Sequence, residues 1–239
     1  MNMAIIKEHD FVEIEYTARI KEDGTIFDTT EEKVAKENNL YDKHSDYSPA
    51  VICVGENNIL KGLEEQMIGR ETGKEYTIEI GSENAFGKKN AKLIQLIPTS
   101  KFRQQNINPV PGLQLNIDGV FGVVKTVSGG RCLVDFNHPL AGKDLVYNVK
   151  INNIVDNDNE KLKSLLKMYL HIKDADTEIN DKSNASELAS TSETRSQLTA
   201  NIISKQDIPK HAQEEFKKIA QRTIPSIKNI NFTIVKERK

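Results

Sequence analysis

The sequence contains no tryptophan, only two cysteines and no long uncharged apolar run. Cys53 and Cys132 stand far apart without a partner spacing, which argues against a disulfide framework or a cysteine-rich zinc site; we expect two small apolar residues on strands. A membrane-spanning helix requires roughly 20 consecutive apolar residues, and no segment approaches that length. The five histidines form no pair at helical spacing, so we predict no metal site and no cofactor.

The chain also lacks a strong charge of either sign. Its 239 residues include 33 lysines and arginines and 35 aspartates and glutamates, a formal net charge of -2. Proteins held on nucleic acid by bulk electrostatics are strongly basic, so this balance argues against that class. The first residues show neither the basic cluster nor the apolar run of a secretory signal, and we expect a cytoplasmic protein without membrane contact.

Alternating apolar and polar residues predict several strands before residue 88. From Phe11 to Ile20 apolar side chains recur at every second position, the period of a half-buried antiparallel strand. Asp23-Gly24 predicts the turn that follows it. The polar, turn-rich segment 31–49 predicts a surface excursion. Shorter strands are predicted at 26–27, 50–54 and 76–80.

One short helix is predicted within this part of the chain. Apolar residues recur at helical spacing from Ile59 to Met67, and Gly69 ends the pattern as a C-cap glycine would. The same spacing places Glu64 and Glu65 on the solvent side. The sequence has no P-loop, no Gly-x-Ser-x-Gly and no His-Glu-x-x-His. Any catalysis is therefore expected to use an apolar site.

The composition of the chain changes after Gly87. Between Lys88 and Asn137, four strand-like pieces alternate with prolines and glycines, which predicts a small all-β module. From Leu145 to Ile154 the strand alternation of the first part resumes. The module is therefore expected to be inserted into the first domain. The four pieces are 93–97, 113–117, 120–127 and 131–136.

Residues 156–239 predict an accessory α/β domain. Its expected elements are a helix at 162–172, a strand at 198–204, a helix beginning at Pro209 and a strand at 230–234, with an acidic, weakly packing segment at 174–197. So few elements seldom close a stable core alone, and strand edges favour pairing, so we expect a homodimer. The alternative is a domain that docks on RNA or the ribosome, because residues 205–239 carry nine bases and four acids, a net +5.

Six segments stand in the order and at the spacing of one known family. They are the first strand with Tyr16, Asp23–Thr30, Val54–Glu65, Gly69–Lys74, Ala85–Gly87 and Leu145–Val149. Over about residues 5–155 the chain thereby resembles the FKBP-type peptidyl-prolyl isomerases. The insertion after Gly87, which rejoins at 137–142, resembles the SlyD-like members with an insert-in-flap chaperone domain, and the added C-terminal part resembles the long archaeal members.

The resemblance implies an α+β fold, in which a half-open antiparallel sheet wraps on a short helix. The resemblance also implies a small all-β domain inserted into this fold and an α/β domain at its C-terminal side. The implied domains are 1–87 together with 138–155 for the isomerase, 88–137 for the inserted chaperone domain and 156–239 for the accessory domain.

The resemblance also implies a shallow apolar pocket between the sheet and the helix. Its catalytic residues would be Tyr16, Asp28 and Phe86, with a backbone N–H near Leu60 holding a substrate carbonyl. Leu63 stands where many members have tryptophan, and Phe86 stands where tyrosine is usual, so a hydroxyl is missing. The long segment 31–49 is expected to reshape one rim. The substrate-binding residues would be Phe27, Ile52, Ile59, Leu60, Leu63, Leu140 and Tyr147.

The implied function is cis–trans isomerisation of X–Pro bonds in unfolded or partly folded polypeptides, combined with chaperone activity. A small β module with edge strands can hold extended chain beside the pocket. The alternative is a non-catalytic holdase or a ribosome-associated binding module on the same scaffold. The module's candidate client-binding residues are Ile97, Phe102, Val110, Leu113 and Phe121; we expect most to form its core and Phe102 to be exposed.

Overall fold

The computed structural model describes residues 3–117, 119–181 and 198–235. By its internal contacts the chain divides into two compact units. The first comprises the residues up to Ala18, Ile26–Ile78 and the residues from Tyr147 onward. The second comprises Arg19–Thr25 and Glu79–Val146. The three-domain division expected from the sequence remains a prediction.

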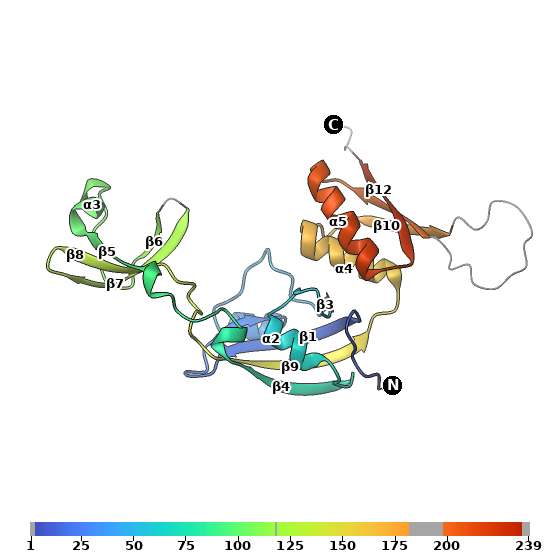
Figure 1. Cartoon of the computed structure of the whole chain (residues 1–239), viewed down its shortest axis with the longest axis horizontal. Helices are drawn as coiled ribbons and strands as arrows, with labels where there is room; N and C mark the ends of the chain where they lie inside the picture. Colours follow the sequence, from blue (N-terminus) through green and yellow to red (C-terminus); the bar gives the residue numbers. More distant parts are fainter. Residues whose placement is uncertain (1–2, 118, 182–197, 236–239) are drawn as a thin grey trace, which may run out of the picture. The chain divides into compact units, whose positions relative to one another are not determined.

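A five-stranded sheet carries the first part of the chain (Figure 1). Its strand order is β2-β1-β9-β4, and β3 pairs with β1 in antiparallel register, so that Phe11 lies opposite Cys53 and Ile14 opposite Ala50. Each of these strands lies where the sequence predicts one, three from alternation and the two short strands β2 and β3 from apolar runs. They are β1 (Phe11–Ile20), β2 (Ile26–Thr29), β3 (Ala50–Cys53), β4 (Lys74–Ile80) and β9 (Leu145–Ile154).

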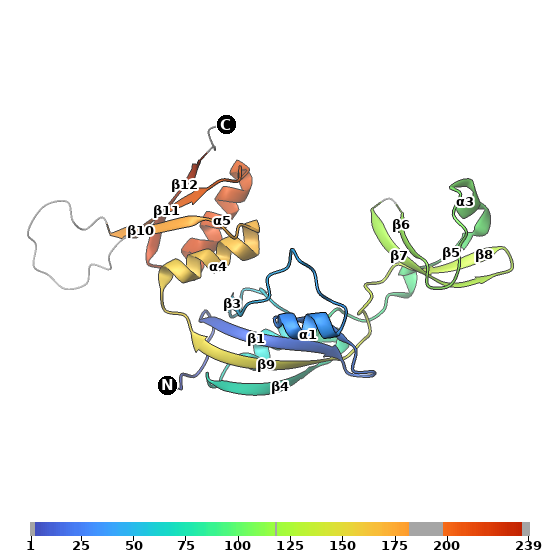
Figure 2. The same ribbon diagram turned by 180° about the vertical axis from the view of Figure 1, so that it is seen from behind.

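Two short helices belong to this part. Helix α2 (Lys61–Met67) confirms the predicted helix and buries Leu63 and Met67. Helix α1 (Glu32–Glu37) lies in the segment predicted only as an excursion, and it is seen beside β1 in Figure 2. The exposed position predicted for Glu64 is wrong, because its side chain is turned inward and the residue is 3% exposed. Glu65 is exposed as expected.

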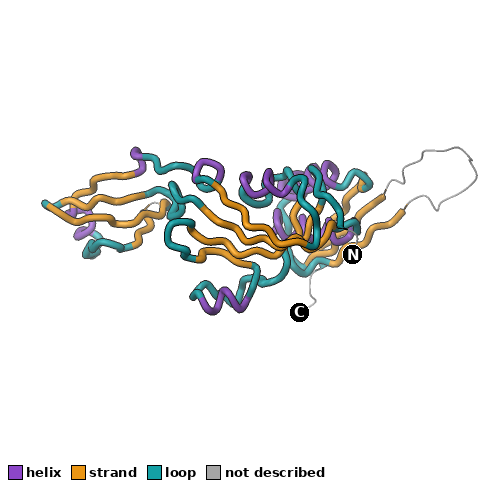
Figure 3. Tube along the Cα trace, turned by 90° about the horizontal axis from the view of Figure 1, so that it is seen from below, coloured by secondary structure: helices purple, strands orange, loops and turns teal. Residues whose placement is uncertain are grey.

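The inserted segment forms a four-stranded antiparallel sheet, in the order β5-β8-β7-β6. Figure 3 colours the strands, helices and loops of the trace separately. The turn Gly129-Gly130 joins β7 to β8, and both glycines have positive φ, as a tight hairpin turn requires. The segment is not all β, because α3 (Thr99–Gln104) follows the first strand. The strands are β5 (Ile94–Pro98), β6 (Gln114–Ile117), β7 (Val120–Ser128) and β8 (Arg131–Asp135), and a 3-10 turn, η2 (Ala91–Leu93), comes before β5. Another 3-10 turn, η1 (Ser82–Asn84), precedes the inserted segment.

The inserted sheet has a small core of its own. Phe102 is 4% exposed and packs there, so the expectation that it is exposed is wrong: α3 turns its ring onto the sheet. Phe121 and Val110 are instead exposed, and Ile97 and Leu113 are half-buried against the core. The buried members of the core are Phe102, Leu115, Val124, Cys132 and Val134.

The last part of the chain forms a three-stranded sheet covered by two helices. Strand β11 (Leu198–Ser204) pairs antiparallel with β10 (Asp176–Asp181) and parallel with β12 (Ile227–Ile234). Helix α4 (Asp158–Leu170) is capped by Asn157, whose side chain accepts from two backbone N–H groups, and α5 (Lys210–Thr223) begins after Pro209. Of the acidic segment 174–197, residues 182–197 lie outside the described part. No helix in the described ranges is long and apolar enough to cross a membrane.

The core of this last part continues into the first sheet. Phe11 of β1 and Cys53 of β3 are buried in the same cluster as Leu162 and Leu165 of α4 and Phe216 of α5. Helix α4 therefore packs on the β1–β3 end of the sheet through a shared apolar core. This continuity makes residues after 156 part of the surroundings of β3 and the loop that follows it.

Candidate active site

Three aromatic side chains meet on the first sheet. The ring centroids of Tyr16 and Tyr147 lie 5.7 Å apart, and those of Phe27 and Tyr147 lie 6.2 Å apart in an edge-on arrangement. Tyr16 comes from β1, Phe27 from β2 and Tyr147 from β9, so the sheet order places all three on adjacent strands. Such tilted contacts are the favoured geometry for aromatic pairs. The sheet therefore provides an apolar wall with two hydroxyl groups.

The Tyr16 hydroxyl has a fixed partner. It donates to Oδ2 of Asp28 at 2.9 Å, while the backbone N–H of Tyr16 donates to the Thr30 hydroxyl. Burial raises the pKa of Tyr16 far above its usual value, and the negative charge of Asp28 raises it further. Burial also raises the pKa of Tyr147. Both phenols therefore stay protonated at neutral pH and act as neutral donors.

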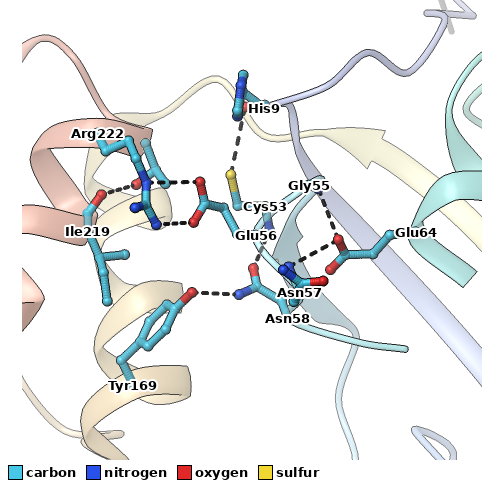
Figure 4. A network of polar contacts seen from close by, with 11 residues as sticks. His9, Cys53, Gly55, Glu56, Asn57, Asn58, Glu64, Tyr169, Ile219 and Arg222 are labelled. Carbon is cyan, nitrogen blue, oxygen red and sulfur yellow. Dashed lines mark hydrogen bonds and ion pairs between the residues drawn. The ribbon is translucent and has the colours of Figure 1, made fainter. Parts of the chain in front are cut away.

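The loop between β3 and α2 is organised by the carboxylate of Glu64 (Figure 4). Oε2 accepts from the backbone N–H groups of Gly55 and Asn57 at 3.0 and 3.1 Å, and Oε1 accepts from that of Ile59 at 3.2 Å. Gly55 and Asn57 both have positive φ, which glycine and asparagine tolerate best. The alternate N–H groups of the loop thus converge on one buried anion.

The geometry of this loop determines where the Leu60 amide points. Leu60 precedes α2, and its carbonyl accepts from the N–H groups of Leu63 and Glu64. Within the described residues its own N–H has no hydrogen-bond acceptor. A backbone donor held in this way can bind a substrate carbonyl without moving.

The last part of the chain holds the same loop from the other side (Figure 4). The Asn58 side chain accepts from the Cys53 N–H and donates to the Tyr169 hydroxyl of α4 at 2.9 Å. Glu56 forms a two-pronged ion pair with Arg222 of α5. Cys53 lies at the base of the loop, and burial together with the Glu56 charge raises the pKa of its thiol to about 12. It is therefore a structural cysteine, as the sequence predicts.

The remaining predicted site residues occupy different positions. Leu63 is buried on α2, Ile59 and Leu60 are half-buried before it, and Ile52 is a core residue of β3 opposite Val12. Phe86 and Leu140 belong to the second unit and are half-buried. There Phe86 stacks on the imidazole of His138, with ring centroids 4.4 Å apart. The site roles of all ten residues remain proposals.

Sequence reasoning missed two sets of residues. One is Glu64, because its three partners are backbone N–H groups and the amino-acid sequence does not reveal which backbone groups a side chain will contact. The other surrounds a cavity of about 450 Å³ that begins at Tyr16, Phe27 and Asp28. Tyr47 of the long segment and Lys167, His171 and Lys173 of the last part line its far side. The lengthened segment 31–49 was the one visible signal, because it predicted a reshaped rim.

The chain is similar to named isomerases from several organisms. It is 34% identical over 156 residues to a short-type peptidyl-prolyl cis-trans isomerase of Methanocaldococcus jannaschii, an alignment covering 65% of this chain and 98% of that protein. It is also 38% identical over 118 residues to a probable FKBP-type 16 kDa isomerase of Pseudomonas fluorescens (47% and 77% covered). The chain belongs to the FKBP-type peptidyl-prolyl isomerases. It is 31% identical over 127 residues to the FKBP-type isomerase SlyD of Vibrio cholerae (52% and 60%).

Two further comparisons concern parts of this FKBP-type chain. Residues 95–140 match the family model described as "FKBP26, IF domain", which overlaps most of the predicted insertion. Among solved structures, the N-terminal domain of FKBP42 from Arabidopsis thaliana is 15% identical, covers 64% of this chain and 78% of its own, and superposes with a TM-score of only 0.33. That superposition supports no conclusion.

We predict that Glu64→Gln will weaken both the fold and the site. An amide offers one acceptor oxygen in place of two and turns its NH₂ toward backbone donors, so the free energy of unfolding should fall by about 2 kcal/mol. Urea unfolding measures this loss. Glu65→Gln is the matched control, because Glu65 is exposed and pairs with Lys61 at the surface; it should change stability by less than about 0.5 kcal/mol. Equal effects of both substitutions would contradict the role assigned to Glu64.

Proposed function

We propose that the chain catalyses cis–trans isomerisation of X–Pro bonds in unfolded and folding polypeptides. The observation that carries this proposal is the aromatic wall of Tyr16, Phe27 and Tyr147 on a sheet whose neighbouring loop leaves the Leu60 N–H without an acceptor. A proline ring fits an apolar wall, and a donor orients the carbonyl that precedes it. Membership of the FKBP-type isomerases supports the same reaction.

The reaction requires no nucleophile and no proton transfer. The partial double-bond character of the peptide C–N bond gives a rotational barrier of about 18–20 kcal/mol. Water stabilises the planar amide, with its larger charge separation, more than the twisted state. A water-poor wall removes part of this preference, and a fixed donor holds the carbonyl while the bond rotates. Lowering the barrier by ~4 kcal/mol corresponds to about a thousandfold acceleration.

Each proposed site residue has a distinct part in this scheme. Phe27 and Tyr147 contact the proline ring, with Ile59, Leu60 and Leu63 on the helix side. The Leu60 N–H binds the carbonyl. Asp28 holds the neutral Tyr16 hydroxyl in one orientation. Phe86 contributes apolar surface only, since it has no hydroxyl. Ile52 supports the wall from the core, and Leu140 is proposed at the rim.

We predict that sub-stoichiometric amounts of the protein will accelerate a proline-limited refolding reaction. Asp28→Ala should lower kcat/KM about tenfold, because the lost charge-assisted hydrogen bond contributes roughly 1.5 kcal/mol to positioning. Asp156→Ala is the control, since Asp156 is exposed and is not one of the proposed site residues. An unchanged refolding time would reject the isomerase in favour of a holdase. An unchanged rate in Asp28→Ala alone would reject the residue assignment.

We also propose that the inserted segment binds extended client chain. Two of its strands, β5 and β6, are edges of the sheet and can accept an added strand. Large apolar side chains are exposed on it, including Leu96, Val120 and Phe121, the last at 43%. A hollow of about 330 Å³ between Leu96, Phe102 and Phe136 offers a site for an apolar side chain. The proposed domain boundaries remain those expected from the sequence.

Excision of residues 88–137, with a short turn in their place, should separate the two activities. Isomerisation of short peptides is expected to persist, because the aromatic wall and the Leu60 loop lie outside the segment. Refolding of a proline-limited protein and suppression of its aggregation should both decline, because the client is no longer held near the pocket. Peptide and protein assays on the same preparation measure this. A parallel loss in both assays would mean that the segment belongs to the isomerase core.

Self-association through the last part of the chain is a further proposal. Strand β12 is an edge of its sheet, and its exposed Ile234 is available for pairing with a second copy. We predict a dimer by light scattering at micromolar concentration and a monomer after removal of residues 156–239. A monomeric full chain would reject the dimer. Salt-sensitive RNA binding would instead favour the basic docking domain. A cytoplasmic location likewise remains a prediction.

A further inference from the structure

The cavity beside Asp28 extends from the aromatic wall to the last part of the chain. Its volume of about 450 Å³ lies within the roughly 300–1,000 Å³ of ordinary ligand sites. Its lining combines Tyr16, Phe27 and Asp28 of the first sheet with Lys167 and Lys173 of the last part of the chain. Because the first three residues also belong to the proposed proline site, a polypeptide bound at that site lies against this cavity.

The charged side chains that line the cavity form two groups by their contacts. The Asp28 carboxylate is engaged with the Tyr16 hydroxyl. In the other group Lys167 pairs with Asp46 at 2.6 Å, and the hydrogen bond from Lys167, then that from Ser48, holds the pKa of Asp46 below its usual range. Lys173 lies near enough to contribute to the same lowering. Two lysines thus share one carboxylate.

Among the described residues, Lys173 forms no ion pair with a carboxylate. Its Nζ donates to the backbone carbonyl of His44 at 3.1 Å, which places the ammonium group but does not neutralise it. His171 follows α4 and also lines the cavity, without adding an acidic group. The Ser45 hydroxyl is a further polar group of the lining, whereas the Ser48 hydroxyl is already engaged with Asp46. The lysine group therefore sets two ammonium groups against one carboxylate, and this net positive charge suits an acidic side chain.

We infer that this cavity binds an acidic side chain of the client polypeptide within a few residues of the proline. The inference rests on the proposed isomerase function and adds a preference to it: clients with aspartate or glutamate near the proline are bound more tightly. The lysines that bind this acidic side chain come from α4 and the segment after it, so the last part of the chain contributes to substrate selection. Tyr47 from the long segment 31–49 also lines the cavity.

The test uses a matched set of unstructured peptides with one Ala-Pro bond. Glutamate or glutamine is placed one, two or three residues before or after the proline, and kcat/KM is measured for the full chain. At one or more positions the glutamate peptide should exceed its glutamine counterpart about three- to fivefold, mainly through a lower KM, as expected for a partly exposed ion pair. The ratio should decline toward one in high salt.

Three variants connect the preference to the cavity. Lys173→Gln should abolish most of the glutamate-to-glutamine ratio. Asp46→Asn should increase the ratio, because it removes the carboxylate that competes for both lysines; general damage to the site would not produce a gain. Lys163→Gln is the control, since Lys163 is exposed on the same helix and does not line the cavity. Its ratio should equal that of the unmodified chain.

The outcomes distinguish this inference from the proposed function. Equal kcat/KM values for glutamate and glutamine at all positions, in a chain that does accelerate Ala-Pro isomerisation, would overturn the inference and leave the function intact. A ratio unaffected by Lys173→Gln and Asp46→Asn would overturn it as well. NMR titration gives Kd for the same peptides: a glutamate preference in Kd without any acceleration would support the cavity and reject the isomerase.

Discussion

The buried carboxylate of Glu64 is the interaction on which the geometry of the site depends. A charged group removed from water is tolerated only when its oxygens are hydrogen-bonded, and here three backbone N–H groups meet that need. The same bonds leave the loop from Gly55 to Ile59 little freedom. The Leu60 N–H that follows is therefore oriented before any substrate arrives, and no ordering of the loop opposes binding.

The aromatic wall obeys a related constraint. Tyr16 and Tyr147 bring hydroxyl groups into an apolar surface, which is unfavourable unless those groups find partners. Asp28 is an acceptor for Tyr16 while it remains exposed itself, so its negative charge stays hydrated at the edge of the wall. The Tyr16 phenol thus stays neutral and the aromatic wall stays apolar, although the Asp28 carboxylate lies at hydrogen-bond distance. Polarity is thereby confined to one rim, where the cavity toward Lys173 begins.

The sequence predicted most strands of this fold and much less of its polar architecture. Strands such as Phe11–Ile20 and Leu145–Ile154 can be predicted because apolar residues recur at every second position within the strand itself. Glu64 was misplaced because helical spacing assigns a side to each residue but cannot anticipate main-chain donors that fold back over a helix end. Phe102 was misplaced because α3 is a six-residue helix, too short for a periodic pattern. The cavity combines residues more than a hundred positions apart, which no local pattern contains.

The last part of the chain is bound into the site by two kinds of contact that reinforce each other. The burial of Phe11 and Cys53 against α4 and α5 stabilises the packing of these elements, but the hydrophobic effect does not fix their orientation. The Asn58–Tyr169 hydrogen bond and the Glu56–Arg222 ion pair fix that orientation, because each forms in only one arrangement of the loop and the helices. Together they hold α4 against β3, and Lys167 and Lys173 are thereby placed in the lining of the cavity. A segment that the sequence suggests only as an accessory therefore contributes to a cavity that Tyr16, Phe27 and Asp28 of the first sheet also line.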